Sequence, residues 1–149
     1  MLTAEGCAAR QFRLWDALPE EYEWVLVSDP RHVNYFANFL VNPISFSTSE
    51  RGLLFLERSG SATLLADNFS LRSASSKPFV SETLETKWYD HKHSVINRDH
   101  GLFSLLKQLD VKFKAGRGLV EAEWLPTMIV DELGLDSETR SLELGSIIR

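Results

Sequence analysis

Three histidines and two aspartates gather in one short stretch of the sequence, YDHKHSVINRDH. His91 and His93 would share one face of an extended segment, with Asp90, Asp99 and His100 nearby. Imidazole and carboxylate groups can together bind zinc or iron, but the stretch lacks the helical i, i+4 spacing that holds two histidines rigidly. It is otherwise a polar surface loop, or a loop whose histidines assist a neighbouring active site.

No other pattern in the sequence supplies a catalytic group. The nucleophile elbow G-x-S-x-G, the phosphate loop G-x-x-x-x-G-K-[ST] and the dinucleotide fingerprint G-x-G-x-x-G are all missing. A nuclease of the ribonuclease H type would need several carboxylates at strand ends to hold two metal ions. The expected strands carry few, namely Glu82, Glu85, Glu121 and Glu143. We therefore assign no catalytic residue and no metal ligand to this chain.

Aromatic side chains crowd the stretch VSDPRHVNYFANFL, which begins at the end of an expected strand. Asp29 and Pro30 form a helix-start signal, and Tyr35, Phe36 and Phe39 follow it. Functional surfaces of α/β folds lie beyond the carboxyl ends of strands, so this cluster is either a hydrophobic plug or part of a functional rim. Six other aromatic residues are expected in the core: Phe12, Trp15, Trp24, Phe55, Phe103 and Trp124.

The elements that must position these residues alternate between helix and strand. The apolar spacing and the Pro and Gly signals predict helices over 8–18, from Pro30, over 99–109 and from Pro126 to Gly134, with a short helix and loop over 68–78. They predict strands over 24–28, 51–57, 62–67, 79–89, 116–124 and 141–149. We expect one α/β domain over 1–149, with a mixed sheet of about five or six strands and helices packed on its faces.

Composition excludes several classes of protein. The chain has 149 residues and a formal charge of -5, and its basic residues form no stripe, which argues against nucleic-acid binding. Cys7 is the only cysteine, so no intrachain disulfide can form. The sequence has neither a signal peptide nor an apolar stretch long enough to span a membrane. These features predict a cytoplasmic protein that does not enter the membrane.

The stretch LVSDPRHVNYFANF resembles the N-terminal domain of the creatinase, prolidase and aminopeptidase P family, which contains a ribonuclease H-like motif. In that family the stretch ends in a Tyr-Leu-Thr-Gly-Phe-like sequence, where this chain has Asn38 in place of glycine; asparagine also tolerates a left-handed backbone. The resemblance extends to the arginine in SERGLLFL, the hairpin LLFLERSGSATLLAD, and GLVEAEWLPTMIVDELG, which is similar to the family's Gly-x-Glu and helix segment.

The resemblance implies a non-catalytic role. In this family the peptidase chemistry belongs to a C-terminal domain whose Asp, Asp, His, Glu and Glu ligands hold two divalent metal ions, such as Mn, Co or Zn. We expect this chain to be a fragment whose catalytic domain is absent, and to need no cofactor itself. The implied partners are its own catalytic domain, further copies in a homodimer or higher oligomer, and a proline-containing peptide or small amide substrate.

The resemblance also suggests which residues line the active site of the catalytic domain. Arg51 matches in position an arginine that creatinases place near the substrate carboxylate, and a guanidinium suits a bidentate grip on that group. The alternative is an arginine that pairs with Glu50 or faces solvent. The candidates for this substrate rim are Tyr35, Phe36, Asn38, Phe39, Arg51, His91 and His93.

Two other functions remain open. The same domain type occurs in a histone-chaperone subunit that has lost peptidase chemistry, so the chain could be a protein-binding or peptide-binding module with no peptidase partner domain. It could also be an independent metal-dependent enzyme built on Asp90, His91 and His93. The sequence that follows Arg149 in the gene would separate the first of these from a hydrolase, and metal analysis would test the second.

Overall fold

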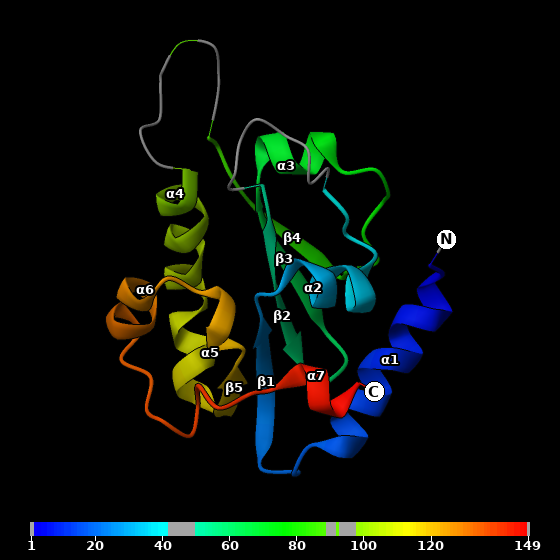
Figure 1. The fold of residues 1–149 in the computed structure, drawn as a ribbon, viewed down its shortest axis with the longest axis vertical. Helices are drawn as coiled ribbons and strands as arrows, with labels where there is room; N and C mark the ends of the chain where they lie inside the picture. The colour runs from blue at the N-terminus through cyan, green and yellow to red at the C-terminus, as the bar shows by residue number, and fades with distance from the viewer. Residues whose placement is uncertain (1, 42–49, 89–91, 93–97, 149) are drawn as a thin grey trace.

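The fold is a single mixed sheet with helices on both faces (Figure 1). The computed structural model describes residues 2–41, 50–88, 92 and 98–148. Within these residues the sheet has five strands in the order β4-β3-β2-β1-β5. Their bounds are β1 (Tyr22–Val27), β2 (Gly52–Glu57), β3 (Ala62–Asp67), β4 (Glu82–Thr86) and β5 (Arg117–Val120). The prediction of a mixed α/β sheet with five or six strands is confirmed.

Strand directions place four carboxyl ends at one edge of the sheet. β1 and β2 are antiparallel, as are β2 and β3, whereas β3 pairs parallel with β4 and β1 pairs parallel with β5. The expected hairpin is therefore β2–β3. As a result β1, β3, β4 and β5 end at the edge where β2 begins, and we call this edge the carboxyl edge.

Alternate side chains of the central strands pack into two separate hydrophobic cores, one on each face of the sheet. Val25 and Leu54 point to the face that is covered by α1 (Ala4–Ala17), α2 (Pro30–Ala37), α3 (Asn68–Ser73) and α7 (Leu144–Ile147). Leu26 and Phe55 point to the face that is covered by α4 (Arg98–Ser104), the 3-10 helix η1 (Leu105–Leu109) and α6 (Thr127–Glu132). α5 (Asp110–Ala115) contributes Phe113 to the second face. This two-residue alternation is what a sheet covered on both sides requires.

Local signals explain how α2 begins and ends. The Asp29 side chain accepts a hydrogen bond from the Arg31 backbone N–H, and Pro30 takes the first helical position. The helix ends at Asn38, whose φ of 56° is left-handed, as asparagine permits. At the other predicted helix end, Gly134 has a φ of 62°. Both helix ends agree with the sequence prediction.

The structure corrects several sequence expectations. α1 begins at Ala4 rather than Ala8, because Thr3 caps it and accepts a hydrogen bond from the Gly6 N–H. The predicted helix over 99–109 is divided into α4 and η1, and α5 continues it. The expected strand over 141–149 is wrong: residues 141–143 form no strand and α7 follows them. Before this stretch, Thr139 C=O accepts a hydrogen bond from Val120 N–H of β5.

Two aromatic residues expected in the core are exposed instead. Phe12 on α1 is 72% exposed, and Trp124, in the 3-10 helix η2 (Ala122–Trp124), is 41% exposed. Phe12 lies outside the helix face formed by Leu14 and Trp15, which carries the burial. In the described part of the chain, no helix has the length and apolar character needed to cross a membrane.

Candidate functional site at the carboxyl edge

The carboxyl edge collects most of the buried charged side chains of the described residues. They come from segments far apart in the sequence: the β1–α2 turn, the start of β2, the end of β3, the start of α4 and the end of β5. The buried members are Asp29, Asp67, Arg98 and Glu121. Buried charges require partners, because desolvation otherwise penalises them heavily. These partners define what the edge can do.

Glu121 fastens the end of β5 to the start of α2. Its side chain is 5% exposed, and its Oε2 accepts hydrogen bonds from the backbone N–H groups of Ser28 at 2.9 Å and Asp29 at 2.8 Å. Its Oε1 makes a short contact with His32 Nδ1. The Ser28 hydroxyl also donates a short hydrogen bond to the Glu121 backbone carbonyl. One carboxylate thus satisfies the turn that opens the α2 helix.

Asp29 is held as a charged helix cap. Its Oδ1 accepts the Arg31 N–H at 2.8 Å and its Oδ2 lies 2.5 Å from Arg31 Nη2. Burial acts to raise the pKa of Asp29, but the hydrogen bonds from the Arg31 side chain and backbone outweigh it, with a further contribution from His32, so the pKa is lowered from its ordinary value. The carboxylate therefore keeps its charge to a lower pH than an ordinary aspartate does.

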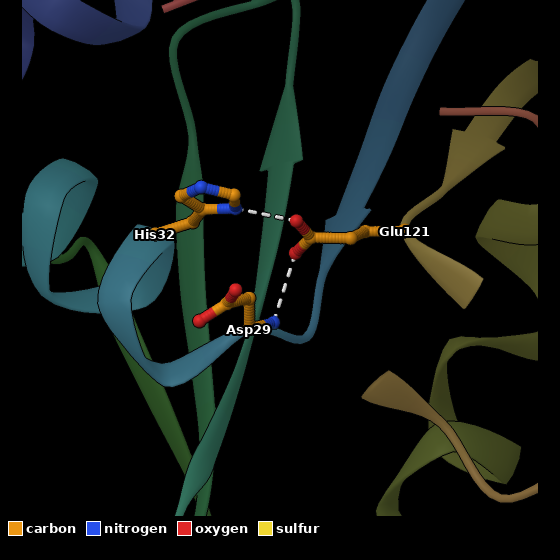
Figure 2. A group of neighbouring side chains, drawn as sticks. All are labelled: Asp29, His32 and Glu121. Carbon is orange, nitrogen blue, oxygen red and sulfur yellow. Dashed lines mark hydrogen bonds and ion pairs between the residues drawn. The ribbon is translucent and has the colours of Figure 1, made fainter. Parts of the chain in front are cut away.

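Asp29, His32 and Glu121 form the one group of three metal-ligand side chains found within the described residues (Figure 2). One candidate ligand atom from each lies within 4.8 Å of the others. The sequence pattern predicted no metal ligand in this chain and did not indicate this group. Both carboxylates already have partners: Arg31 for Asp29, and two backbone N–H groups with His32 for Glu121. A cation would have to displace the contact of His32 with Glu121, so the geometry suits a structural link between the end of β5 and the start of α2.

The Asp29 cap predicts a specific loss of stability in acid. Because its pKa is lower in the folded protein than the value of about 3.9 in an unfolded chain, its stabilisation is complete above that pH and is lost as pH falls through the folded value. Asp29→Asn keeps a capping oxygen but removes the charge. We expect Asp29→Asn to be less stable than the parent chain at pH 7, with a smaller difference at about pH 2.5.

Urea unfolding at both pH values measures this effect. Asp16→Asn is the matched control, because Asp16 is exposed on α1 and the structure gives it no capping role. The control should lie close to the parent chain at each pH. An Asp29→Asn difference that is equal at the two pH values would show that the charge does not stabilise the cap.

A second buried cluster surrounds Arg98 at the start of α4. Arg98 Nε lies 2.5 Å from Asp67 Oδ2, and Nη2 lies 2.9 Å from Asp67 Oδ1, so the pair is bidentate. Nη2 also donates to the Ser70 hydroxyl at 2.8 Å, and Nη1 lies 3.5 Å from Glu50 Oε1. The guanidinium lies over the Trp88 ring at 4.3 Å. This cluster joins the ends of β3 and β4 to α4 and the segment before β2.

Arg51 lies between the two clusters. Its Nη1 donates to the Trp124 carbonyl at 2.8 Å, its Nη2 lies 3.3 Å from Asp99 Oδ1, and its guanidinium lies 5.1 Å from the centre of the Phe103 ring. Its side chain is 15% exposed. Arg51 therefore contacts α4 and the segment after β5, and only a small part of it reaches the surface.

The other rim candidates lie in different surroundings. Phe36 is 0% and Phe39 3% exposed, so these rings have the core role that the sequence analysis left open. Tyr35 is half-buried, and Arg10 of α1 lies 4.8 Å from its ring centre. Asn38 is 7% exposed and its Nδ2 donates to the Lys77 carbonyl at 3.1 Å. His91 and His93 lie outside the described residues.

Comparison with known proteins identifies the fold. No model of a known protein family matches the sequence, and no curated protein matches it. Several chains in solved structures are similar, among them the creatinase/prolidase-like N-terminal domain of a protein assigned as a metallopeptidase from Corynebacterium diphtheriae. It has a TM-score of 0.52 and 15% identity, and the likeness covers 91% of this chain and 90% of that one. The resemblance seen in the sequence is thus confirmed for the fold.

Proposed function

We propose that this chain is the non-catalytic N-terminal domain of a dinuclear-metal hydrolase that acts on Xaa-Pro peptides or on a small creatine-like amide. The single observation that carries the proposal is the structural likeness over 91% of the chain to an N-terminal domain of this type. The catalytic domain would hold the two divalent ions, Mn, Co or Zn. This chain would form part of the wall of the active site and a contact between subunits.

The chemistry of the carboxyl edge supports a scaffold role. Glu121 accepts hydrogen bonds from two backbone N–H groups and Arg98 pairs with Asp67, so these side chains stabilise the contacts between strand ends and helix starts. On the surface of the same edge, Arg31 lies 5.5 Å from the Trp124 ring centre, and both side chains are exposed. An exposed tryptophan beside arginine is a common feature of protein interfaces. We therefore propose this edge as the face toward the catalytic domain.

Arg51 is the candidate for contact with the substrate. It reaches the same edge through its hydrogen bond to the Trp124 carbonyl, and its Nε has no hydrogen-bond partner among the described residues. One N–H therefore remains to meet a carboxylate if the edge rearranges on contact with the catalytic domain. The single cysteine, Cys7, is buried and unpaired, which suits the proposed cytoplasmic location.

The proposal is tested by assaying the purified chain with Xaa-Pro dipeptides and tripeptides in the presence of Mn²⁺ or Co²⁺. We expect no turnover, because the metal ligands belong to the catalytic domain. Turnover above the rate of a heat-unfolded sample would overturn the division of labour. The gene downstream of Arg149 gives a second test: a reading frame with the Asp, Asp, His, Glu and Glu ligands supports the hydrolase, whereas their loss would favour the binding module.

A further inference from the structure

A cavity of about 680 Å³ lies between β5, α5 and α6, and its lining includes none of the residues of the two ionic clusters at the carboxyl edge. Its apolar lining includes Trp24, Leu106, Phe113, Ile129 and Leu133. This volume falls within the range that small-molecule sites occupy, and such sites combine an apolar lining with a few fixed polar groups.

The backbone of Gly118 supplies one donor and one acceptor at the open edge of β5. Glu121 N–H donates to Leu26 C=O of β1, so alternate residues of β5 turn their backbone groups away from β1. Val120 does so, because its N–H donates to Thr139 C=O at 2.6 Å. Gly118, two residues earlier, faces the same way and lines the cavity. It is buried, and neither of its outward groups has a hydrogen-bond partner among the residues described.

Buried backbone groups without partners are rare, since each loses hydration without compensation. At Gly118 a ligand amide could therefore hydrogen-bond with the outward N–H and C=O, as a residue of an additional strand next to β5 would. The space beyond it is limited at one end, because Thr139 already occupies the outer edge of β5 at Val120 and also donates its N–H to Asp136 Oδ1 at 2.7 Å. A ligand of dipeptide size fits this boundary, whereas a long extended chain does not.

The aromatic wall of the cavity is fixed before any ligand arrives. The Trp24 ring lies directly on Gly118: a Cβ atom at Gly118 would come within 1.9 Å of the ring. The Trp24 indole N–H donates to the Gly116 carbonyl at 3.0 Å, and the Phe113 ring centre lies 4.8 Å from that of Trp24. Glycine at 118 thus brings the backbone amide next to an aromatic face.

Six of the seven charged side chains that line the cavity already form ion pairs with one another. Lys107 pairs with Glu132 at 3.0 Å, Lys114 with Asp110 at 2.5 Å, and Arg117 with Glu138 at 2.7 Å. All six of these residues line the cavity, and the seventh, Asp136, accepts the Thr139 N–H on its Oδ1. A charged ligand would have to compete with these pairs, whereas an uncharged ligand would not. The lining therefore favours a neutral compound.

We propose that this cavity binds a neutral amide of dipeptide size that carries one large apolar group. The apolar group packs on Trp24 and Phe113, and the amide hydrogen-bonds with the N–H and C=O of Gly118. The site is separate from the carboxyl edge, so this proposal is independent of the proposed hydrolase role.

Titration of the ¹⁵N-labelled chain with N-acetyl-L-phenylalaninamide tests the site by NMR. We expect saturable shifts at the Gly118 amide and the Trp24 indole N–H, with a dissociation constant on the order of 1 mM, which is reasonable for a ligand of this size. N-acetylglycinamide, which lacks the apolar group, should bind at least about tenfold more weakly. The absence of saturable shifts at these two positions up to about 10 mM probe would overturn the proposal.

A pair of tryptophan variants locates the binding. Leu135→Trp places a large side chain at the half-buried cavity lining and should weaken binding at least about tenfold. Val111→Trp adds the same group at a side chain that is 78% exposed and does not line the cavity, so it should bind like the parent chain. Equal binding by Leu135→Trp would place the ligand elsewhere and overturn the assignment. The titration of the parent chain decides the matter even if this variant does not fold.

Discussion

Arg98→Ala is expected to lower the free energy of unfolding by about 3–5 kcal/mol, the range seen when one partner of a buried ion pair is removed. The Arg98 side chain is 4% exposed, and the Asp67 and Glu50 side chains that it contacts are 1% and 3% exposed. Alanine would leave both carboxylates without their common cation in a place that water cannot easily reach. Urea unfolding at pH 7 gives the change directly.

Arg117→Ala is the matched control for this prediction. Arg117 also contacts two carboxylates, Glu21 at 3.2 Å and Glu138 at 2.7 Å, but its side chain is 55% exposed. Exposed ion pairs contribute little, so this variant should lose less than about 1 kcal/mol. If the two variants lost equal stability, burial would not be the reason for the importance of Arg98. A cycle with Asp67→Ala would then measure the coupling of the pair.

Local sequence signals predicted the parts of the fold whose causes are local. Asp29 and Pro30 are adjacent in the sequence and together determine where α2 begins, and Asn38 ends the helix with a left-handed backbone. The β2–β3 hairpin follows from two apolar runs around Gly60, whose φ of 100° favours glycine. In each case the residues that determine the element are the residues that form it.

The errors arose where tertiary contacts decide the outcome. Leu142 and Leu144 alternate with polar residues as a strand would, yet both pack into the core beside α1. The β5 edge bonds instead to Thr139. The alternation was real, but it reflected burial of two side chains rather than pairing of a strand. Hydrophobic spacing alone does not separate these cases in a short segment.

The candidate site was harder to predict because its members are distant in sequence. His32 and Glu121 are 89 residues apart, and Asp67 and Arg98 are 31 apart. Asp29 was identified only as a cap, and Glu121 only as one of a few acidic residues in expected strands. The parallel pairing of β1 with β5 brings these residues together. A polar residue directly after each of two strands was the available signal, and it becomes specific only when the strand order is known.

Glu121→Ala is expected to lower the free energy of unfolding by about 3 kcal/mol, because a buried donor without an acceptor costs about 1–3 kcal/mol and two donors are affected. The N–H groups of Ser28 and Asp29 would both lose the Glu121 carboxylate, and His32 would lose its partner. Hydrogen exchange gives a local measurement: the Ser28 and Asp29 amides should exchange faster, by more than the loss of global stability explains.

Glu123→Ala distinguishes the loss of the Glu121 hydrogen bonds from the general effect of removing an acidic residue. Glu123 lies two positions further along the chain and is exposed, so its replacement should change stability by no more than about 0.5 kcal/mol. Slow exchange at Ser28 and Asp29 in Glu121→Ala would show that the carboxylate does not hold the turn.

A melting experiment with Zn²⁺ tests whether Asp29, His32 and Glu121 bind a cation. If Zn²⁺ raised the melting temperature of the parent chain but not of His32→Ala or Glu121→Ala, the three residues would be a cation site. We expect no such rise, because the two backbone N–H groups already occupy Glu121 Oε2 and His32 occupies Oε1.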